Sequence, residues 1–238
     1  MAGDTPTQPA MLGVPSALDG QRRGLVWGAV AGLVGMLAWI VGLAMVPTSA
    51  HLSDGDAAVA SMVEAAAVRL FIAVQLGGLG AVLLLVLLAG LVVSVPAAAL
   101  GGLSLRVGLV AGVLTQAIVG TSTVFAAVAA FSAANGGGAA LVAWGWTGLF
   151  AGFAVSGVPT VVMTAGVVLG AHAARLAPPW VSTLGLLSGL AHILAATTFA
   201  RTGPFALDGI IGLVTPLTTV LWIVALSIVL LVRANRPS

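Results

Sequence analysis

The chain has 238 residues, of which 60% are apolar and only 6% are charged. A soluble domain carries about 25% charged residues, so the composition excludes a water-facing surface and indicates an all-α, polytopic membrane protein. The net charge of +2 arises from eight arginines and six acids without a long basic cluster, which argues against nucleic-acid binding. Without cysteine there are no disulfides or thiolate metal sites, and no cofactor is predicted.

The chain begins with a polar stretch rich in proline and glycine, and residues 1–22 are expected to form a disordered cytoplasmic tail. Residues 23–234 are predicted to form a single membrane domain. Its first apolar run, 24–46, is longer than the roughly 7–15 residues of a signal-peptide core. We therefore predict a retained membrane span there.

Residues 51–68 differ from the rest of the chain because acids alternate with alanines. Val59, Met62, Val63 and Ala66 recur at helical spacing in this stretch. The pattern predicts an external amphipathic helix that continues into the next span.

Five further apolar runs follow, and each is as long as the roughly 20 residues needed to cross the hydrocarbon core. The connections between them contain proline or glycine. The sequence thus predicts a bundle of six transmembrane helices, the last five at about 69–95, 105–134, 140–172, 180–200 and 208–232.

The arginines predict the orientation of the bundle. If the connections alternate sides, six of the eight fall on the side of the N-terminal tail, namely Arg22, Arg23, Arg106, Arg175, Arg233 and Arg236. Short basic loops stay in the cytoplasm, so both termini are expected there. The bias toward Ala, Val, Leu, Gly and Arg is typical of a GC-rich bacterial genome, which makes the bacterial cytoplasmic membrane the expected location.

Few polar side chains lie inside the predicted spans. At about 1.5 Å per residue, six of them fall at a similar depth near the middle of the membrane. These candidate ligand-binding residues are His192, Ser156, Thr215, Thr219, Thr121 and Ser122. A polar layer beside proline-interrupted helices is typical of transporter binding sites. The alternative is that these groups only form hydrogen bonds between or within helices.

A second constellation of polar residues lies at the predicted external boundary. It consists of Glu64, Arg69, Arg201 and Asp208, which could form ion pairs or select a charged solute.

Ser156 followed by Gly157 in the fourth span resembles the nucleophile motif of the rhomboid family of intramembrane serine proteases. That resemblance would make His192 the base. The sequence departs from the family, because Ala154 replaces the first motif glycine and the histidine lies in the fifth span. We therefore expect no catalytic residues.

A broader resemblance covers roughly residues 50–232. The stretches 55–58, 179–180, 191–196 and 208–209 are similar to an uncharacterised family of six-span bacterial membrane proteins. This resemblance implies the same helix bundle and no assigned catalytic residues.

Three functions remain open from the sequence. The first is a non-enzymatic scaffold or regulatory membrane partner, which could associate with another membrane protein or with itself. The second is a small-molecule transporter or membrane substrate-binding subunit that uses the polar layer around His192. The third is an intramembrane serine hydrolase built on Ser156 and His192. Sparse intramembrane charge favours the first.

Overall fold

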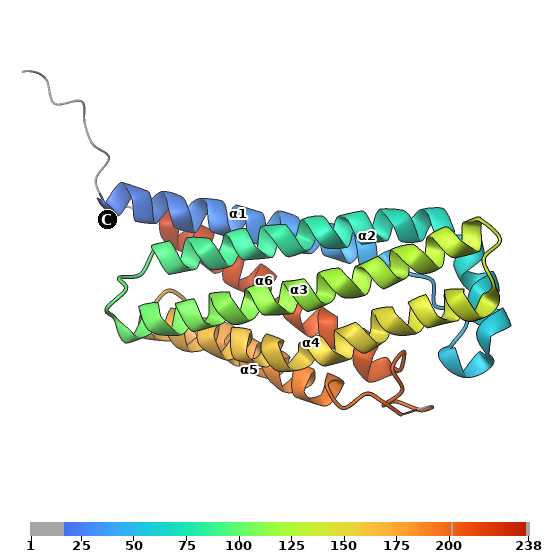
Figure 1. Cartoon of the computed structure of the whole chain (residues 1–238). Coiled ribbons are helices and arrows are strands. Elements are labelled where there is room, and N and C mark those ends of the chain that lie inside the picture. The colour runs from blue at the N-terminus through green and yellow to red at the C-terminus, as the bar shows by residue number, and fades with distance from the viewer. Residues whose placement is uncertain (1–16, 201, 237–238) are drawn as a thin grey trace, which may run out of the picture.

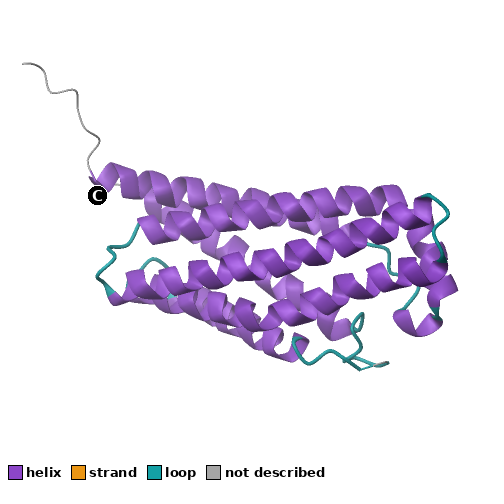
Figure 2. Ribbon diagram, in the orientation of Figure 1, coloured by secondary structure: helices purple, strands orange, loops and turns teal. Residues whose placement is uncertain are grey.

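The computed structural model describes residues 17–200 and 202–236, and these form an all-helical bundle without a strand (Figure 2). One isolated β-bridge joins Ala200 and Ala206. The helices are α1 (Ala17–Ala44), the short 3-10 helix η1 (Leu52–Asp54), α2 (Asp56–Val93), α3 (Leu100–Ala134), α4 (Ala139–Ala173), α5 (Pro179–Ala195) and α6 (Ile210–Ala234).

Five of these helices, all except η1 and α5, are long and apolar enough to cross a membrane. Their outward faces carry exposed large apolar side chains, such as Leu37, Val110 and Leu221. Because such surfaces are not stable in water, the described part of the chain has the character of a multi-pass membrane protein.

The first two helices begin earlier than hydropathy predicts. Residues 1–16 of the expected tail lie outside the described residues, but 17–22 already belong to α1. Arg22, at the start of α1, donates from Nε to the carbonyl oxygen of Ala234 at 2.8 Å and so caps the C-terminus of α6. The helix expected in 51–68 continues into the next span, because α2 runs without a break from Asp56 to Val93.

The fifth helix is shorter than the predicted span 180–200. It ends at Ala195, where the hydroxyls of Thr197 and Thr198 donate to the carbonyl oxygens of Leu194 and Ala195 at 2.7 and 2.6 Å. These bonds satisfy carbonyls that the helix leaves unpaired at its end. With 17 residues, α5 is about 25 Å long.

The helices form a closed ring, because each packs against the next along the chain and α6 returns to α1 (Figure 1). One end of the ring, named the arginine end here, carries the start of α1, the connections 94–99 and 174–178, and the end of α6. The opposite end carries the connections 45–55, 135–138 and 196–209. Figure 1 also shows α6 crossing the bundle diagonally, from α1 at the arginine end toward α5 at the opposite end.

Glycines bring two helix pairs into close contact. A Cβ atom added to Gly90 in α2 would lie 2.5 Å from the carbonyl oxygen of Gly24 and 3.0 Å from Cα of Gly28, both in α1. In the α3–α4 pair, a Cβ added to Gly166 would lie 2.6 Å from the backbone nitrogen of Gly108. Small-residue stripes that allow such an approach are typical of membrane helix packing, and here they are used within the bundle.

Two apolar cores hold the ring together. The larger core fills the arginine end with side chains such as Leu87, Leu91 and Leu230, which are at most 1% exposed. The smaller core lies at the opposite end, where the start of α2 packs against α3 and α4. Val59, Met62, Val63 and Ala66, the predicted apolar face of 51–68, are all buried, which confirms the helical periodicity of that segment.

Candidate functional site

A cavity of about 150 Å³ lies inside the ring, and all six α-helices contribute to its wall. Its lining residues come from the second half of α1, the middle of α2 and α4, the second half of α3, the end of α5 and the start of α6. The cavity therefore extends from the middle of the bundle toward the opposite end. The larger core closes it at the arginine end, where Met36, Leu84 and Met163 belong to both the core and the wall.

The wall of the cavity is mainly apolar. Trp39 of α1 meets Phe153 of α4 edge to face, with ring centroids 6.5 Å apart, and both rings line the cavity with Phe150. Glycine makes room at Gly77, because a Cβ atom added there would meet nothing within 4 Å. A concave, mainly apolar space with a few polar groups is the usual form of a small-molecule site.

His192 is the only ionisable residue in the cavity wall among the described residues. Its Nδ1 lies 2.8 Å from the carbonyl oxygen of Ser188, one turn earlier in α5. A carbonyl oxygen only accepts, so Nδ1 carries the proton in this arrangement. The other ring nitrogen, Nε2, has no hydrogen-bond partner within the part of the chain that the structure describes.

The structure brings three more of the predicted residues to the same cavity, namely Ser156, Thr215 and Thr219. Ser156 donates its hydroxyl to the carbonyl oxygen of Phe153 at 2.8 Å, and Thr215 donates to that of Ile211 at 2.7 Å. Such bonds to the preceding turn are the ordinary way for a hydroxyl to be satisfied in a membrane helix.

Thr219 differs from these two hydroxyls because its partner is a side chain on another helix. Its Oγ1 lies 2.9 Å from Oγ of Ser188, which is one turn before His192 in α5. This pair therefore links α6 to α5. Thr218 donates to the carbonyl oxygen of Thr215 and lies 3.4 Å from the same Ser188 hydroxyl. Ser188 thus contacts His192 through its carbonyl oxygen and the hydroxyls of α6 through its own hydroxyl.

Two of the predicted residues do not reach the cavity. Thr121 is exposed on the outside of α3 and donates to the carbonyl oxygen of Ala117 at 2.9 Å. Ser122 is buried between α3 and α4, where its hydroxyl occupies the space that a Cβ atom on Gly152 would need. Both lie at the predicted depth but face other directions.

Gln116 lines the cavity, although it was not among the predicted site residues. Its amide has no hydrogen-bond partner within the described residues. The sequence did contain a signal for it, because Gly108, Gly112 and Gln116 recur every four residues on one face of α3. The two glycines of that face pack inside the bundle, so the glutamine one turn later also points inward.

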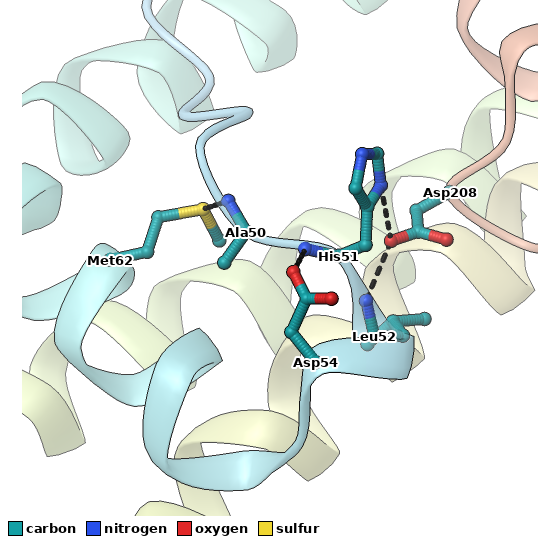
Figure 3. Close-up of polar contacts among 6 residues, drawn as sticks. All are labelled: Ala50, His51, Leu52, Asp54, Met62 and Asp208. Atoms are coloured by element: carbon teal, nitrogen blue, oxygen red, sulfur yellow. Dashed lines mark hydrogen bonds and ion pairs between the residues drawn. The ribbon is translucent and has the colours of Figure 1, made fainter.

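The predicted external charge cluster takes a different form in the structure. Arg201 lies outside the described residues, and neither Glu64 nor Arg69 forms an ion pair within the described ones. Asp208 instead accepts from the backbone N–H of Leu52 at 2.7 Å and lies 3.3 Å from Nδ1 of His51, as Figure 3 shows.

We name this arrangement of Asp208, His51 and Leu52 the clasp. It ties the connection before α2 to the connection before α6 (Figure 3). Leu207, next to Asp208, and Val46, in the turn that follows α1, both line the cavity. The clasp therefore ties together two connections whose residues line the cavity at the opposite end of the bundle.

Ser156 and His192 share the cavity but form no hydrogen bond with each other. Each is bonded to its own helix instead, so the nucleophile–base contact of a serine hydrolase is not formed. Within the described residues, no group of three or more His, Asp or Glu side chains could hold a metal ion.

Comparison of the sequence with models of known families, with curated proteins and with solved structures found no match.

Proposed function

We propose that this chain is a six-span protein of a bacterial cytoplasmic membrane that binds a small, mainly apolar molecule inside its helix bundle. Both termini would lie in the cytoplasm. The observation that carries the proposal is the cavity of about 150 Å³ that His192 shares with Ser156, Thr215 and Thr219. A membrane substrate-binding subunit or a transporter would use such a site.

The number of spans and their orientation have separate support. The outward face of α5 carries exposed Leu186, Leu187 and Leu190, as expected for a helix in contact with lipid. The Arg22–Ala234 bond places the start of α1 and the end of α6 at one end of the bundle. That end carries most of the arginines, which favours the cytoplasm.

The size of the cavity supports a ligand with about the volume of an aromatic ring. An engineered apolar cavity of about 150 Å³ in another protein stays dry and binds benzene. The present cavity has a similar volume and adds a small number of polar groups. The larger core at the arginine end favours a binding site over an open pore.

The scaffold hypothesis relied on helix contacts and on the external segment 51–68 as a surface for a partner protein. The apolar face of this segment is buried against α3 and α4 of the same chain. Its polar face, with Glu64, and Val68 at its end remain exposed. This burial favours ligand binding over a scaffold role.

Benzene binding to the purified full-length protein tests the proposal through the unfolding temperature in detergent. The ligand raises this temperature only when it binds the folded state better than the unfolded one. Gly77→Leu would fill the cavity, because a Cβ atom at Gly77 points into open space within its wall. Gly78→Leu is the matched control, since Gly78 is exposed, equally unobstructed and outside the wall.

We expect benzene to stabilise the wild type and Gly78→Leu equally, with a much smaller effect on Gly77→Leu. At a free concentration of 100 times Kd, the expected stabilisation is about 2.7 kcal/mol. Equal shifts in all three proteins would mean that benzene acts through the micelle, and the proposal would be wrong.

A further inference from the structure

The hydrogen bonds around the cavity determine which kind of ligand it can accept. Nδ1 of His192 donates to the Ser188 carbonyl oxygen at 2.8 Å. The two nitrogens lie on different edges of the ring, so Nε2 is the atom farther from that contact. In the neutral imidazole with a proton on Nδ1, Nε2 carries a lone pair and can only accept.

Three hydroxyl protons in the cavity wall are already used. Ser156, Thr160 and Thr215 each donate to a backbone carbonyl oxygen of their own helix at 2.7–2.8 Å. Their oxygens retain the capacity to accept. Pro216, also in the wall, has no N–H to donate to the carbonyl oxygen of Gly212. This side of the cavity is therefore rich in acceptors.

The charge of the ligand follows from the residues that are missing from the wall. Among the described residues, no Asp, Glu or Arg lines the cavity. A cationic donor such as an amine would be buried without a counter-charge, which is strongly unfavourable inside a membrane protein. The donor must be neutral.

We infer that the ligand is a neutral, mainly apolar molecule with a hydroxyl group, whose O–H donates to Nε2 of His192. This inference rests on the proposed function of the same cavity. A hydroxyl fits better than an N–H group alone, because its oxygen can also accept. The Gln116 amide, on α3, offers unused N–H groups to the same cavity. Lipophilic alcohols and phenols are the matching chemical class.

Phenol and anisole test the inference, because they differ only in whether the oxygen attached to the ring carries a proton or a methyl group. Binding to the full-length protein in detergent would be measured from unfolding temperatures, with free concentrations corrected for partitioning into micelles. A hydrogen bond to an otherwise unpaired acceptor should make phenol bind about tenfold more tightly than anisole. Benzene, which can neither donate nor accept in this way, is the reference for the apolar contribution.

His192→Phe keeps a ring in the wall and removes the acceptor. In this variant phenol and anisole should bind with about equal affinity. Benzene should bind with nearly unchanged affinity, since it makes no use of the acceptor. If the variant does not fold, the comparison of phenol with anisole in the wild type is decisive by itself.

The two proposals fail in different ways. Equal affinities of phenol and anisole for the wild type, with benzene still sensitive to Gly77→Leu, would overturn the hydroxyl inference and leave the binding function in place. A loss of the Gly77→Leu effect on benzene would remove the binding function, and the inference with it. Persistence of the phenol preference in His192→Phe would show that another group accepts the proton, which also overturns the inference.

Discussion

Replacement of Asp208 by alanine should loosen the end of the bundle where the clasp ties two connections together. The side chain of Asp208 is only 9% exposed, and its carboxylate accepts a hydrogen bond of 2.7 Å from the Leu52 N–H. A hydrogen bond to a charged group contributes about 1.5–3 kcal/mol. The His51 contact adds less, because it is 3.3 Å long and the His51 side chain is 59% exposed. We expect Asp208→Ala to lower the local stability by about 2 kcal/mol.

Hydrogen exchange of the backbone amides in residues 50–56 measures this local opening directly. A loss of about 2 kcal/mol corresponds to exchange that is about 30-fold faster. Asp208→Asn keeps a neutral acceptor for the Leu52 N–H and should have a smaller effect, and His51→Ala should have the smallest effect of the three.

Glu64→Gln is the charge-matched control, since Glu64 is exposed and has no described partner. If Asp208→Ala and Glu64→Gln accelerated exchange equally, the clasp would contribute nothing beyond net charge. An effect of His51→Ala as large as that of Asp208→Ala would show that the exposed His51–Asp208 contact carries the stability, contrary to our reasoning.

Three other predictions concern the bundle itself. Gly90→Ala should destabilise the bundle by about 1–3 kcal/mol through overpacking against α1, whereas Gly78→Ala should not. Equal unfolding temperatures of the two variants would contradict the close approach of α1 and α2. Leu87→Ala in the larger core should cost about 2–5 kcal/mol in the same assay, and a loss below 1 kcal/mol would refute tight packing there. The chain has no cysteine, so single substitutions can report topology. An impermeant maleimide added to spheroplasts should label Ser53→Cys but not Ala98→Cys, and the reverse pattern would invert the proposed orientation.

The helices were predictable from the sequence, but their ends were not. Hydropathy marks where a chain can contact lipid, and α1 extends beyond that region because Arg22 bonds to the end of α6. Residues 56–68 and the following apolar run obey the same helical period, so both lie in α2. At the end of α5, Thr197 and Thr198 bond to the last carbonyls, a local competition that average hydropathy does not include.

The candidate site was predictable in depth but not in direction. Residue position along a helix sets depth at about 1.5 Å per residue, which grouped His192 with Ser156, Thr215 and Thr219. Direction depends on how each helix is rotated, and neighbours in a helix point about 100° apart. Thr121 therefore faces outward although it lies at the right depth.

The short fifth helix has a consequence for the surrounding lipid. A hydrocarbon core is about 30 Å thick, whereas α5 is about 25 Å long and α2, with 38 residues, about 57 Å. If α5 crosses the membrane as proposed, lipids beside it have to compress by about 5 Å, and this mismatch costs fractions of a kcal/mol per Å. The protein should therefore prefer thinner bilayers, and the lipid annulus should be thinnest on the side where α5 contributes His192 to the cavity.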